Sequence, residues 1–436
     1  MKLNILILEL MAIASFAAAQ NLVTDSDLFN FHFQQTIVTQ GHLSFHADYS
    51  GPHSLHPYCE TATSITTTAF LGLNLLNGLN VYFNPELSGG TGISSAIGLA
   101  GYSNGETYRI SDPKPVIYPA RLFITYTINL DQEMTEEIKD DINQLPNKQS
   151  KNNLIIVAGK FSILDFFDDN EFSHEPRTQF LNWAIWSSAA WDYPADTRGY
   201  TYGLTAMYNN PSWGAKIASI MEPKDPNGLN LDAHINKAFG LAFEADKFYS
   251  VSDLPGIARF LIFLNKSRMG NYQEALNNPI YNLDIVQTEA YSRTKYGLAL
   301  NLSQKLSSSV GGFLRLSWND GKNETWAFTE IDRAISCGII LDHPINGRND
   351  DQFGIALAVN GISQDHKNYI AAGGLGFMIG DGKLNYGNEM ILESFYKLQF
   401  SRYISISPDY QLIINPAYNK DRGPVHIFGI RVHTEF

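Results

Sequence analysis

Short segments in which apolar and polar residues alternate recur along most of the chain, and this pattern limits the possible folds more than any other feature. In the last such segment, Phe428, Ile430 and Val432 fall on one face, and Arg431 and His433 fall on the other. Successive side chains of a β-strand point to opposite faces, so each segment is expected to form a strand with one apolar face. The chain is therefore expected to be an all-β protein.

The number and length of these segments predict a transmembrane antiparallel up-and-down β-barrel. About sixteen strands of about ten residues are typical of a mid-sized barrel of this kind. No internal run approaches the roughly 18 apolar residues that a membrane-spanning helix needs. The expected strands are 29–38, 65–76, 81–86, 121–128, 153–161, 200–209, 213–220, 238–244, 259–265, 295–302, 313–318, 333–342, 352–360, 390–400, 404–414 and 428–436.

A soluble β-sandwich shows the same alternation, but the lengths of the connections favour the barrel. Outer-membrane barrels have long outer loops and short periplasmic turns. The segment 129–152 breaks this rule, and its Glu136, Glu137 and Asp140 are expected to lie on a small acidic helix on the periplasmic side. The long connections are 39–62, 87–118, 162–199, 267–293 and 361–389, and the short ones are 77–78, 210–212, 304–308 and 401–403.

The two faces of the strands indicate which side of the barrel wall faces water. Tyr200 and Tyr208 share the apolar face of one strand and lie roughly 27 Å apart along it, or about 20 Å after barrel tilt, which matches the spacing of two aromatic girdles. The opposite faces are rich in Gly, Ala, Ser and Thr with isolated charges, which a water-filled lumen tolerates and a dry sandwich core does not. We expect the polar faces to line the lumen and the apolar faces, including Tyr200, to contact lipid.

The first 19 residues have the pattern of a Sec-type signal peptide, with Lys2, an apolar run and Ala17, Ala18 and Ala19 before Gln20. The mature chain, 20–436, is therefore expected to be an exported barrel domain. The formal net charge of −13 argues against a nucleic-acid partner, since phosphate binding needs a basic surface.

The two cysteines, Cys59 and Cys337, are too few for a disulfide framework. A single bridge between them and two unpaired thiols are both compatible with the sequence. Cys337 falls between Ile335 and Ile339 on the apolar face of its strand, so we expect it to face lipid.

No catalytic signature is present among the short motifs GxSxG, HExxH, GxxxxGK[ST] and CxxC, so the sequence predicts neither an enzyme nor a cofactor. Asp165, Asp168 and Asp169 could supply oxygen ligands to a calcium ion. An exposed acidic turn is the alternative interpretation of these residues.

Aromatic and charged residues are concentrated in the segment 180–198, which has neither a strand nor a helix period. Sugars offer C–H faces to aromatic rings and hydroxyl groups to carboxylates and forked donors, so these side chains could form a sugar-selective constriction. Alternatively, the aromatic residues only fix a long loop inside the barrel, and Asp192 or Asp196 pairs with Arg198. The candidates are Trp183, Trp186, Trp191, Asp192, Tyr193, Asp196 and Arg198.

Arg259, Arg315 and Arg431 all fall on the expected inner face. Rings of charge in a pore set the preference for ions or solutes, so at least one of them could contact a permeating solute. The alternative is that each pairs with a lumenal carboxylate such as Glu393 or Glu435.

Several long motifs resemble the carbohydrate-selective porin family of the OprB type, and the likeness spans nearly the whole mature chain. The motifs are FNPELSGG (83–90), GKFSILDFFDDNEFSHEPRTQFLNWAIW (159–186), WDYPADTRGYTYG (191–203), LPGIARFLIFLN (254–265), GDGKLNY (380–386) and NPAYNKDRGPVHIFGIRVHTEF (415–436). The resemblance implies a sixteen-stranded barrel in the outer membrane of a Gram-negative bacterium that passes sugars by diffusion. The 129–152 insertion and Cys59 depart from the family pattern.

The resemblance also implies functional residues. The family's constriction would map onto Arg177, Asp192, Asp196 and Arg198, and also onto Arg109, with 162–199 as the constriction loop. The terminal Phe436 is similar to the aromatic end that barrel-assembly machinery reads.

The expected function is passive diffusion of mono- or oligosaccharides across the outer membrane, with sugars and membrane lipid as partners and a monomer or homotrimer as the assembly. Three alternatives remain open: a general or ion-selective porin, an accessory barrel in a larger surface assembly, and an outer-membrane enzyme such as a lipid hydrolase. The hydrolase would need a Ser–His pair, and neither His426 nor His433 has a serine at a telling spacing.

Overall fold

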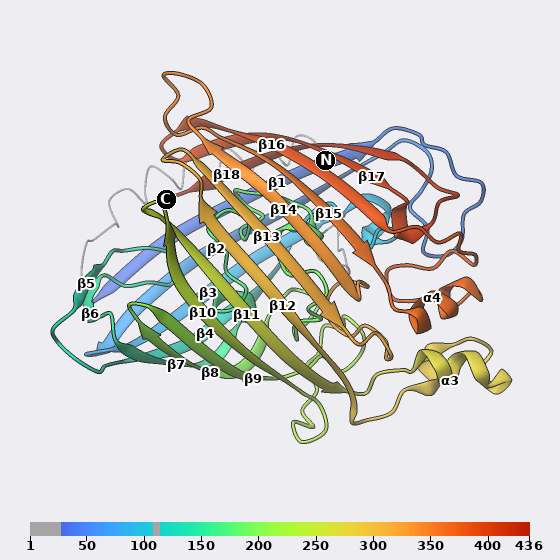
Figure 1. Cartoon of the computed structure of the whole chain (residues 1–436), viewed down its shortest axis with the longest axis horizontal. Helices are drawn as coiled ribbons and strands as arrows, with labels where there is room; N and C mark the ends of the chain where they lie inside the picture. The colour runs from blue at the N-terminus through green and yellow to red at the C-terminus, as the bar shows by residue number, and fades with distance from the viewer. Residues whose placement is uncertain (1–27, 108–113) are drawn as a thin grey trace.

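The computed structural model describes residues 28–107 and 114–436 and shows a closed barrel of antiparallel strands (Figure 1). The expected signal peptide, 1–19, and Arg109 lie outside the described residues. The barrel strands are β1 (Phe29–His42), β2 (Glu60–Leu76), β3 (Leu79–Gly90), β4 (Val116–Asn129), β7 (Asn153–Phe161), β8 (Thr201–Asn210), β9 (Trp213–Ile220), β10 (Phe239–Val251), β11 (Leu254–Ser267), β12 (Arg293–Lys305), β13 (Val310–Asn319), β14 (Arg333–Asp342), β15 (Gln352–Gly361), β16 (Glu389–Ser401), β17 (Ile404–Ile414) and β18 (Val425–Glu435).

The ring closes where β1 pairs with β18, in a register that places Gln34 opposite Glu435 and His42 opposite Ile427. In a bilayer core no water is present to satisfy a free backbone N–H or C=O, so a strand sheet can span it only as a closed ring. The predicted fold class is confirmed. None of the helices in the described part of the chain is long and apolar enough to cross a membrane.

The two faces of the strands separate as the alternation predicts. On β11, Phe260 and Ile262 are each 45% exposed on the outside, while Leu261 and Asn265 are buried inside. Cys337 is exposed on the outer face of β14, as expected, and both cysteines are free thiols. The apolar faces therefore form the outer band that contacts lipid.

The two ends of the barrel differ. At one end, tight turns such as Asn77-Gly78 join the strands, with Gly78 at a φ of 81° that favours glycine. At the other end, long loops carry the short helices (Figure 1). These helices are η1 (Ile93–Ala96), η2 (Ile163–Asp165), α2 (Trp183–Trp186), α3 (Tyr272–Asn277), η3 (Pro279–Tyr281), η4 (Ile285–Thr288), α4 (Gln364–Ala371) and η5 (Pro416–Tyr418).

The acidic segment on the short-turn side is a β-hairpin, so the predicted helix is wrong. Its strands are β5 (Thr135–Ile138) and β6 (Asn147–Ser150), with Thr135 paired to Ser150. A helix here would place like charges four residues apart, for example Glu136 and Asp140, and such pairs destabilise helices. We call residues 130–152 the mouth hairpin.

The expected lipid-facing position of Tyr200 is also wrong. Strand β8 begins at Thr201, and Tyr200 is only 6% exposed, with its hydroxyl donating to Glu86 inside the barrel. Gly199, at a φ of 90°, turns the chain just before it. The lipid-facing residues of this strand start at Tyr202 and continue with Leu204.

The outward orientation of Ile262 allows a direct test of the membrane-facing surface. Its neighbours across the sheet, Phe243 and Leu298, are also exposed on the outside. Replacing Ile262 with Arg should lower the free energy of unfolding in lipid bilayers by about 2–4 kcal/mol, because this is the cost of an arginine on the lipid-facing surface near the midplane. Ile262→Ala is the control for lost volume, and equal stabilities of the two variants in denaturant titrations would contradict this orientation.

Candidate functional site

The loop between β7 and β8, residues 162–200, lies inside the barrel and is called here the lumen loop. It is bonded to strands from much of the ring: Asp168 accepts from Asn301 of β12 at 2.7 Å, and the backbone N–H of Asn182 donates to Glu393 of β16 at 3.0 Å. Helix α2, within the loop, lies against β14 and β15. We call the inner faces of β10 to β18, which hold this loop, the packed wall.

Two of the predicted arginines bind the loop backbone. Arg315 donates to the carbonyl oxygens of Ile185 and Ser173 at 3.0 and 2.6 Å, and Arg431 donates to those of Pro176 and Gln179 at 2.7 and 2.6 Å. Both side chains are about 1% exposed. They satisfy loop carbonyls that would otherwise be buried without partners. These arginines position the lumen loop and do not line an open channel.

Arg259, the third predicted arginine, pairs with Asp169 of the loop at 3.2 Å. It is 5% exposed. It therefore belongs to the same contact between the loop and the packed wall.

Asp192 and Trp191 are also structural within the loop. The Asp192 carboxylate accepts from the backbone N–H groups of Trp326 and Ala327 at 2.8 and 2.7 Å and pairs with Lys295 at 3.3 Å. Trp191 is 1% exposed and packs against Phe263 on β11. Neither residue borders the cavity described next.

A cavity of about 490 Å³ runs between the lumen loop and the opposite side of the barrel. That side is formed by inner-face residues of β1, β2, β3 and β4, such as Gln34, Thr66, Ser88 and Thr125, and we call it the open wall. The volume falls in the range of small-molecule sites. The lumen loop is thus packed against β10 to β18, and the cavity lies between the loop and β1 to β4.

Glu86 of β3 is the polar centre of this cavity. It accepts from the hydroxyls of Tyr118 and Tyr200 at 2.5 and 3.0 Å, and from Thr68 at 2.7 Å. Arg177 of the lumen loop pairs with it at 3.1 Å. A carboxylate with this many donors is held in one orientation.

Arg177 crosses from the loop to three strands of the open wall. Besides Glu86, its guanidinium donates to Gln34 on β1 at 2.9 Å and to Thr68 on β2 at 3.1 Å, and it pairs with Glu106 at 3.2 Å. The arginine that the resemblance assigns to the constriction therefore borders the cavity. Its charge is compensated by Glu86 and Glu106.

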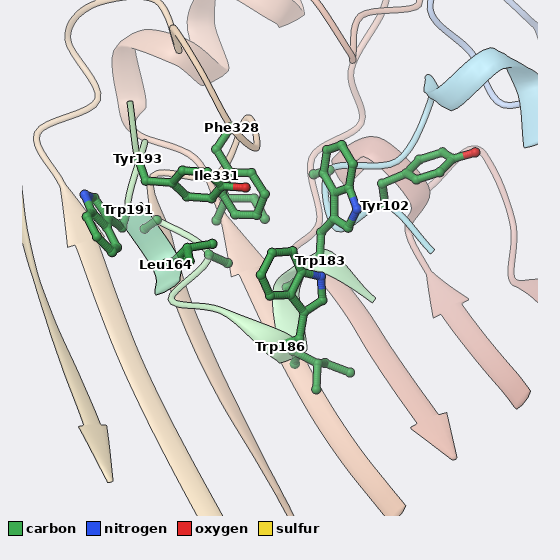
Figure 2. Packing of buried hydrophobic residues seen from close by; sticks show 14 of the residues in the cluster. Tyr102, Leu164, Trp183, Trp186, Trp191, Tyr193, Phe328 and Ile331 are labelled. Atoms are coloured by element: carbon green, nitrogen blue, oxygen red, sulfur yellow. The ribbon is translucent and has the colours of Figure 1, made fainter. Parts of the chain in front are cut away.

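Aromatic rings form the loop side of the cavity (Figure 2). Phe328, from the connection between β13 and β14, is stacked on Trp183 with ring centroids 5.5 Å apart and contacts Tyr193 at 4.2 Å. Trp186 approaches the same ring edge-on at 6.0 Å. All four side chains line the cavity.

Arg198 and Asp196 lie at the end of the loop. The Arg198 guanidinium is stacked 3.9 Å above the ring of Tyr118, and within the described residues no carboxylate is paired with it. Asp196 accepts from the backbone N–H groups of Arg198 and Tyr200 at 2.9 and 3.1 Å, and it lies 3.9 Å from Lys160. The expected pair of Asp196 with the Arg198 side chain is therefore replaced by a backbone contact.

The three calcium candidates do not converge. Asp165 forms a bidentate pair with Arg121 at 2.6 and 2.7 Å, Asp168 accepts from Arg315, and Asp169 pairs with Arg259. Across residues 28–107 and 114–436, no cluster of three His, Cys, Asp or Glu side chains is arranged to hold a metal ion. These carboxylates are partners of arginines.

Sequence reasoning missed several residues of the cavity. Glu86 could have been found, since it is an isolated charge on the polar face of a strand and falls in the motif 83–90. Tyr200 was assigned to the wrong face, and Phe328 lies in a connection without any periodic signal. The missed lining residues are Glu86, Glu106, Tyr118, Arg121, Tyr200 and Phe328.

A family model described as "Carbohydrate-selective porin, OprB family" matches residues 64–436. Porin AaxA of Chlamydia abortus is 22% identical over 295 residues, which cover 67% of this chain and 56% of that protein. Porin AaxA of Chlamydia pneumoniae is 26% identical over 280 residues, covering 64% and 55%. The chain spans about half the length of these curated relatives.

Solved structures share the fold at low sequence identity. Pseudomonas putida OprB in its high-pH structure superposes with a TM-score of 0.70 at 14% identity, covering 94% of each chain. The outer-membrane channel DcaP of Acinetobacter baumannii gives a TM-score of 0.51 at 10% identity, covering 94% of this chain and 97% of that one. This likeness shows the barrel fold.

The charge of the cavity should respond to pH. Burial raises the pKa of Asp196 and the pKa of Glu106, so both carboxyls take up protons at a higher pH than ordinary ones. The reversal potential in a salt gradient should therefore shift toward anion preference as pH falls, and this shift should begin at a higher pH than ordinary carboxyls would give. Asp196→Asn should reduce this shift, and a selectivity that stays constant with pH in both proteins would contradict it.

Loss of the hydrogen bonds that the Arg315 guanidinium donates should release the lumen loop. Arg315→Met leaves the Asp168 charge and two loop carbonyls without this donor, and breaking such a buried pair costs about 3–5 kcal/mol. We expect lower unfolding stability and single-channel currents that fluctuate between levels. Arg315→Lys, which keeps the charge but not the fork, should be intermediate; steady wild-type currents in Arg315→Met would show that the loop is held without it.

Proposed function

Because this chain belongs to the carbohydrate-selective porin family, we propose that it lets mono- or oligosaccharides diffuse passively across the outer membrane along the open wall. Family and fold are those of outer-membrane channels. The sugar preference rests on the chemistry of the cavity. Residues 1–19 would direct export through the Sec route, and Phe436, whose ring is stacked on Phe33 at 5.2 Å, would be read during barrel assembly.

The observation that carries this proposal is the pairing of an aromatic side with a polar side across one cavity. Trp183, Trp186 and Tyr193 offer ring surfaces from the lumen loop. Glu86, which is held by Arg177, Tyr118 and Tyr200, and the forked guanidinium of Arg198 form the polar side nearby. A sugar has apolar C–H faces and a rim of hydroxyl groups, so it matches both sides at once.

Two cavity-lining residues carry a buried donor without a partner. The indole N–H of Trp186 and the Nε–H of Arg198 have no hydrogen-bond partner in the described part of the chain, and both atoms are enclosed. Both residues line the cavity. A small movement of neighbouring side chains would bring either donor within reach of a sugar hydroxyl, which would favour a hydroxylated solute over a small ion.

Binding of this kind is suited to passage. A channel conducts when a solute is attracted strongly enough to enter and weakly enough to leave, so several weak contacts serve better than one tight site. The proposed transport needs neither a cofactor nor energy input. Its rate would depend on the width of the cavity and on these contacts.

Sugar block of ion current in planar bilayers tests the proposal. Glucose or maltose oligomers should reduce the conductance reversibly in the wild-type protein. Trp186→Ala and Arg198→Ala should each weaken the block by raising the sugar concentration that halves the current, by roughly fivefold or more for the loss of about 1 kcal/mol of contact.

Matched controls separate the site from the chemistry of the substitution. Trp213, the first residue of β9, and Arg402, in the turn between β16 and β17, are exposed and do not line the cavity, so Trp213→Ala and Arg402→Ala should leave the block unchanged. A wild-type channel whose current no sugar affects would refute the sugar preference and favour a general porin. A block unchanged in Trp186→Ala and Arg198→Ala would refute the assigned residues.

A further inference from the structure

The mouth hairpin lies at the short-turn end of the barrel, opposite the end that carries α3 and α4 (Figure 1). In outer-membrane barrels the short-turn end faces the periplasm. The hairpin joins β4 to β7, yet its tip does not extend freely into solvent. It bends over the lumen toward strands earlier in the ring.

Specific contacts fix the tip against the inner faces of β1 and β3. The side-chain amide of Asn30, on β1, donates to Asp140 at 2.7 Å and to the carbonyl of Gln144 at 2.9 Å. On β3, Asn84 donates to Asn143 at 2.9 Å. Asn30 and Asn84 are 6% and 0% exposed, so the hairpin tip covers inward-facing side chains of both strands.

An apolar contact adds to this docking. Leu145, next to the tip, is 1% exposed, and its backbone N–H donates to the hydroxyl of Tyr82 on β3 at 3.3 Å. Tyr82 is itself buried and stacked on Phe123 of β4 at 5.1 Å. The hairpin therefore has a buried apolar residue of its own, Leu145, that holds it against the barrel.

The inner face of β3 connects the hairpin to the charged part of the cavity. Its successive inward residues are Tyr82 and Asn84, which contact the hairpin, and Glu86, which contacts Arg177 and Tyr200. Neighbours on one face of a strand are roughly 7 Å apart. The hairpin tip thus lies about one sugar ring away from Glu86 along the open wall.

The tip itself borders the cavity. Ile142, Asn143 and Gln144 line it together with Arg121 and Thr125 of β4. The backbone N–H groups of Asp141 and Gln144 bond each other's carbonyls at 3.1 and 3.0 Å, which makes a tight turn, and Asn143 takes a φ of 53° that suits asparagine. The turn presents an uncharged amide to the passage, below the charged groups at Glu86.

From this geometry we infer that the mouth hairpin is a second selectivity element, which narrows the periplasmic end of the passage and contacts solutes through Asn143 and Gln144. The inference rests on the proposed passage along the open wall. It assigns the size limit for permeating solutes to the hairpin tip in addition to the lumen loop. The side chains that the tip adds to the cavity lining, Ile142, Asn143 and Gln144, are uncharged, which suits neutral hydroxylated solutes.

Removal of the hairpin tests the size limit. Asn129 of β4 faces Asn153 of β7 across the sheet, so a two-residue Asn-Gly turn can replace residues 130–152. The shortened protein should show a higher single-channel conductance and admit larger polyethylene glycols in liposome swelling. Heat-modifiable electrophoretic mobility shows that it has folded. Unchanged conductance and size limit in a folded protein would overturn the inference.

A single substitution tests the position of the tip without altering the fold. Asn143→Asp adds a carboxylate at the tip and keeps an acceptor for Asn84. At about 1 M salt the Debye length is about 3 Å, so only a charge beside the path shifts the reversal potential toward cations. Gln132→Glu makes the same chemical change at an exposed position of the hairpin away from the cavity.

The two proteins should therefore differ: Asn143→Asp shifts the reversal potential and Gln132→Glu does not. No shift in Asn143→Asp would overturn the inference. Sugar block is measured on the same proteins, because a wild-type channel without sugar block refutes the proposed function, while the conductance and reversal potential still decide whether the hairpin limits the passage.

Discussion

Pairing of β1 with β18 is the constraint on which the rest of the structure depends. Without that closure, two strands would expose unpaired N–H and C=O groups in hydrocarbon, where each costs several kcal/mol. Closure also fixes the two faces of every strand, so that residues such as Ile262 contact lipid and Asn265 faces inward. The polar lumen is a consequence of this arrangement, and the lumen must then be filled or left open to water.

The lumen loop fills part of that space because the packed wall supplies partners for its backbone. Arg315, Arg431 and Glu393 each satisfy loop groups that would otherwise be buried unpaired. Apolar residues of the same wall, such as Phe263, receive rings of the loop. The cavity is therefore one-sided: it borders the open wall, where the side chains of Glu86 and its partners line it, and the proposed passage follows that wall.

The barrel could be predicted from the sequence because alternation reports directly on which face of each strand is buried. A strand is still placed correctly when its predicted boundary is wrong by one or two residues. At Tyr200 the alternation begins one residue before the start of β8, where Gly199 turns the chain. The mouth hairpin was predicted as a helix because an acidic composition does not distinguish a helix from a strand. The like charges at Glu136 and Asp140, four residues apart, are the sequence signal that argues against a helix there.

The site was only partly predictable, since it depends on which sides of an irregular loop meet which strands. Arg177, Trp183, Trp186, Tyr193, Asp196 and Arg198 were identified by type and border the cavity, whereas Trp191 and Asp192, of the same types in the same segment, face the other way. Nothing in the sequence distinguishes these two sets. Their difference arises from long-range contacts, such as that of Asp192 with Lys295.

Cysteine accessibility tests the central claim, a passage confined to the open wall, most directly. Ser88 lines the cavity from β3, and Ser336 faces the lumen from β14, where α2 lies against the wall. With Cys59 and Cys337 replaced by serine, a thiol reagent added to single channels should reduce the current of Ser88→Cys and leave that of Ser336→Cys unchanged. Equal reduction in both, or reduction only in Ser336→Cys, would contradict the one-sided passage.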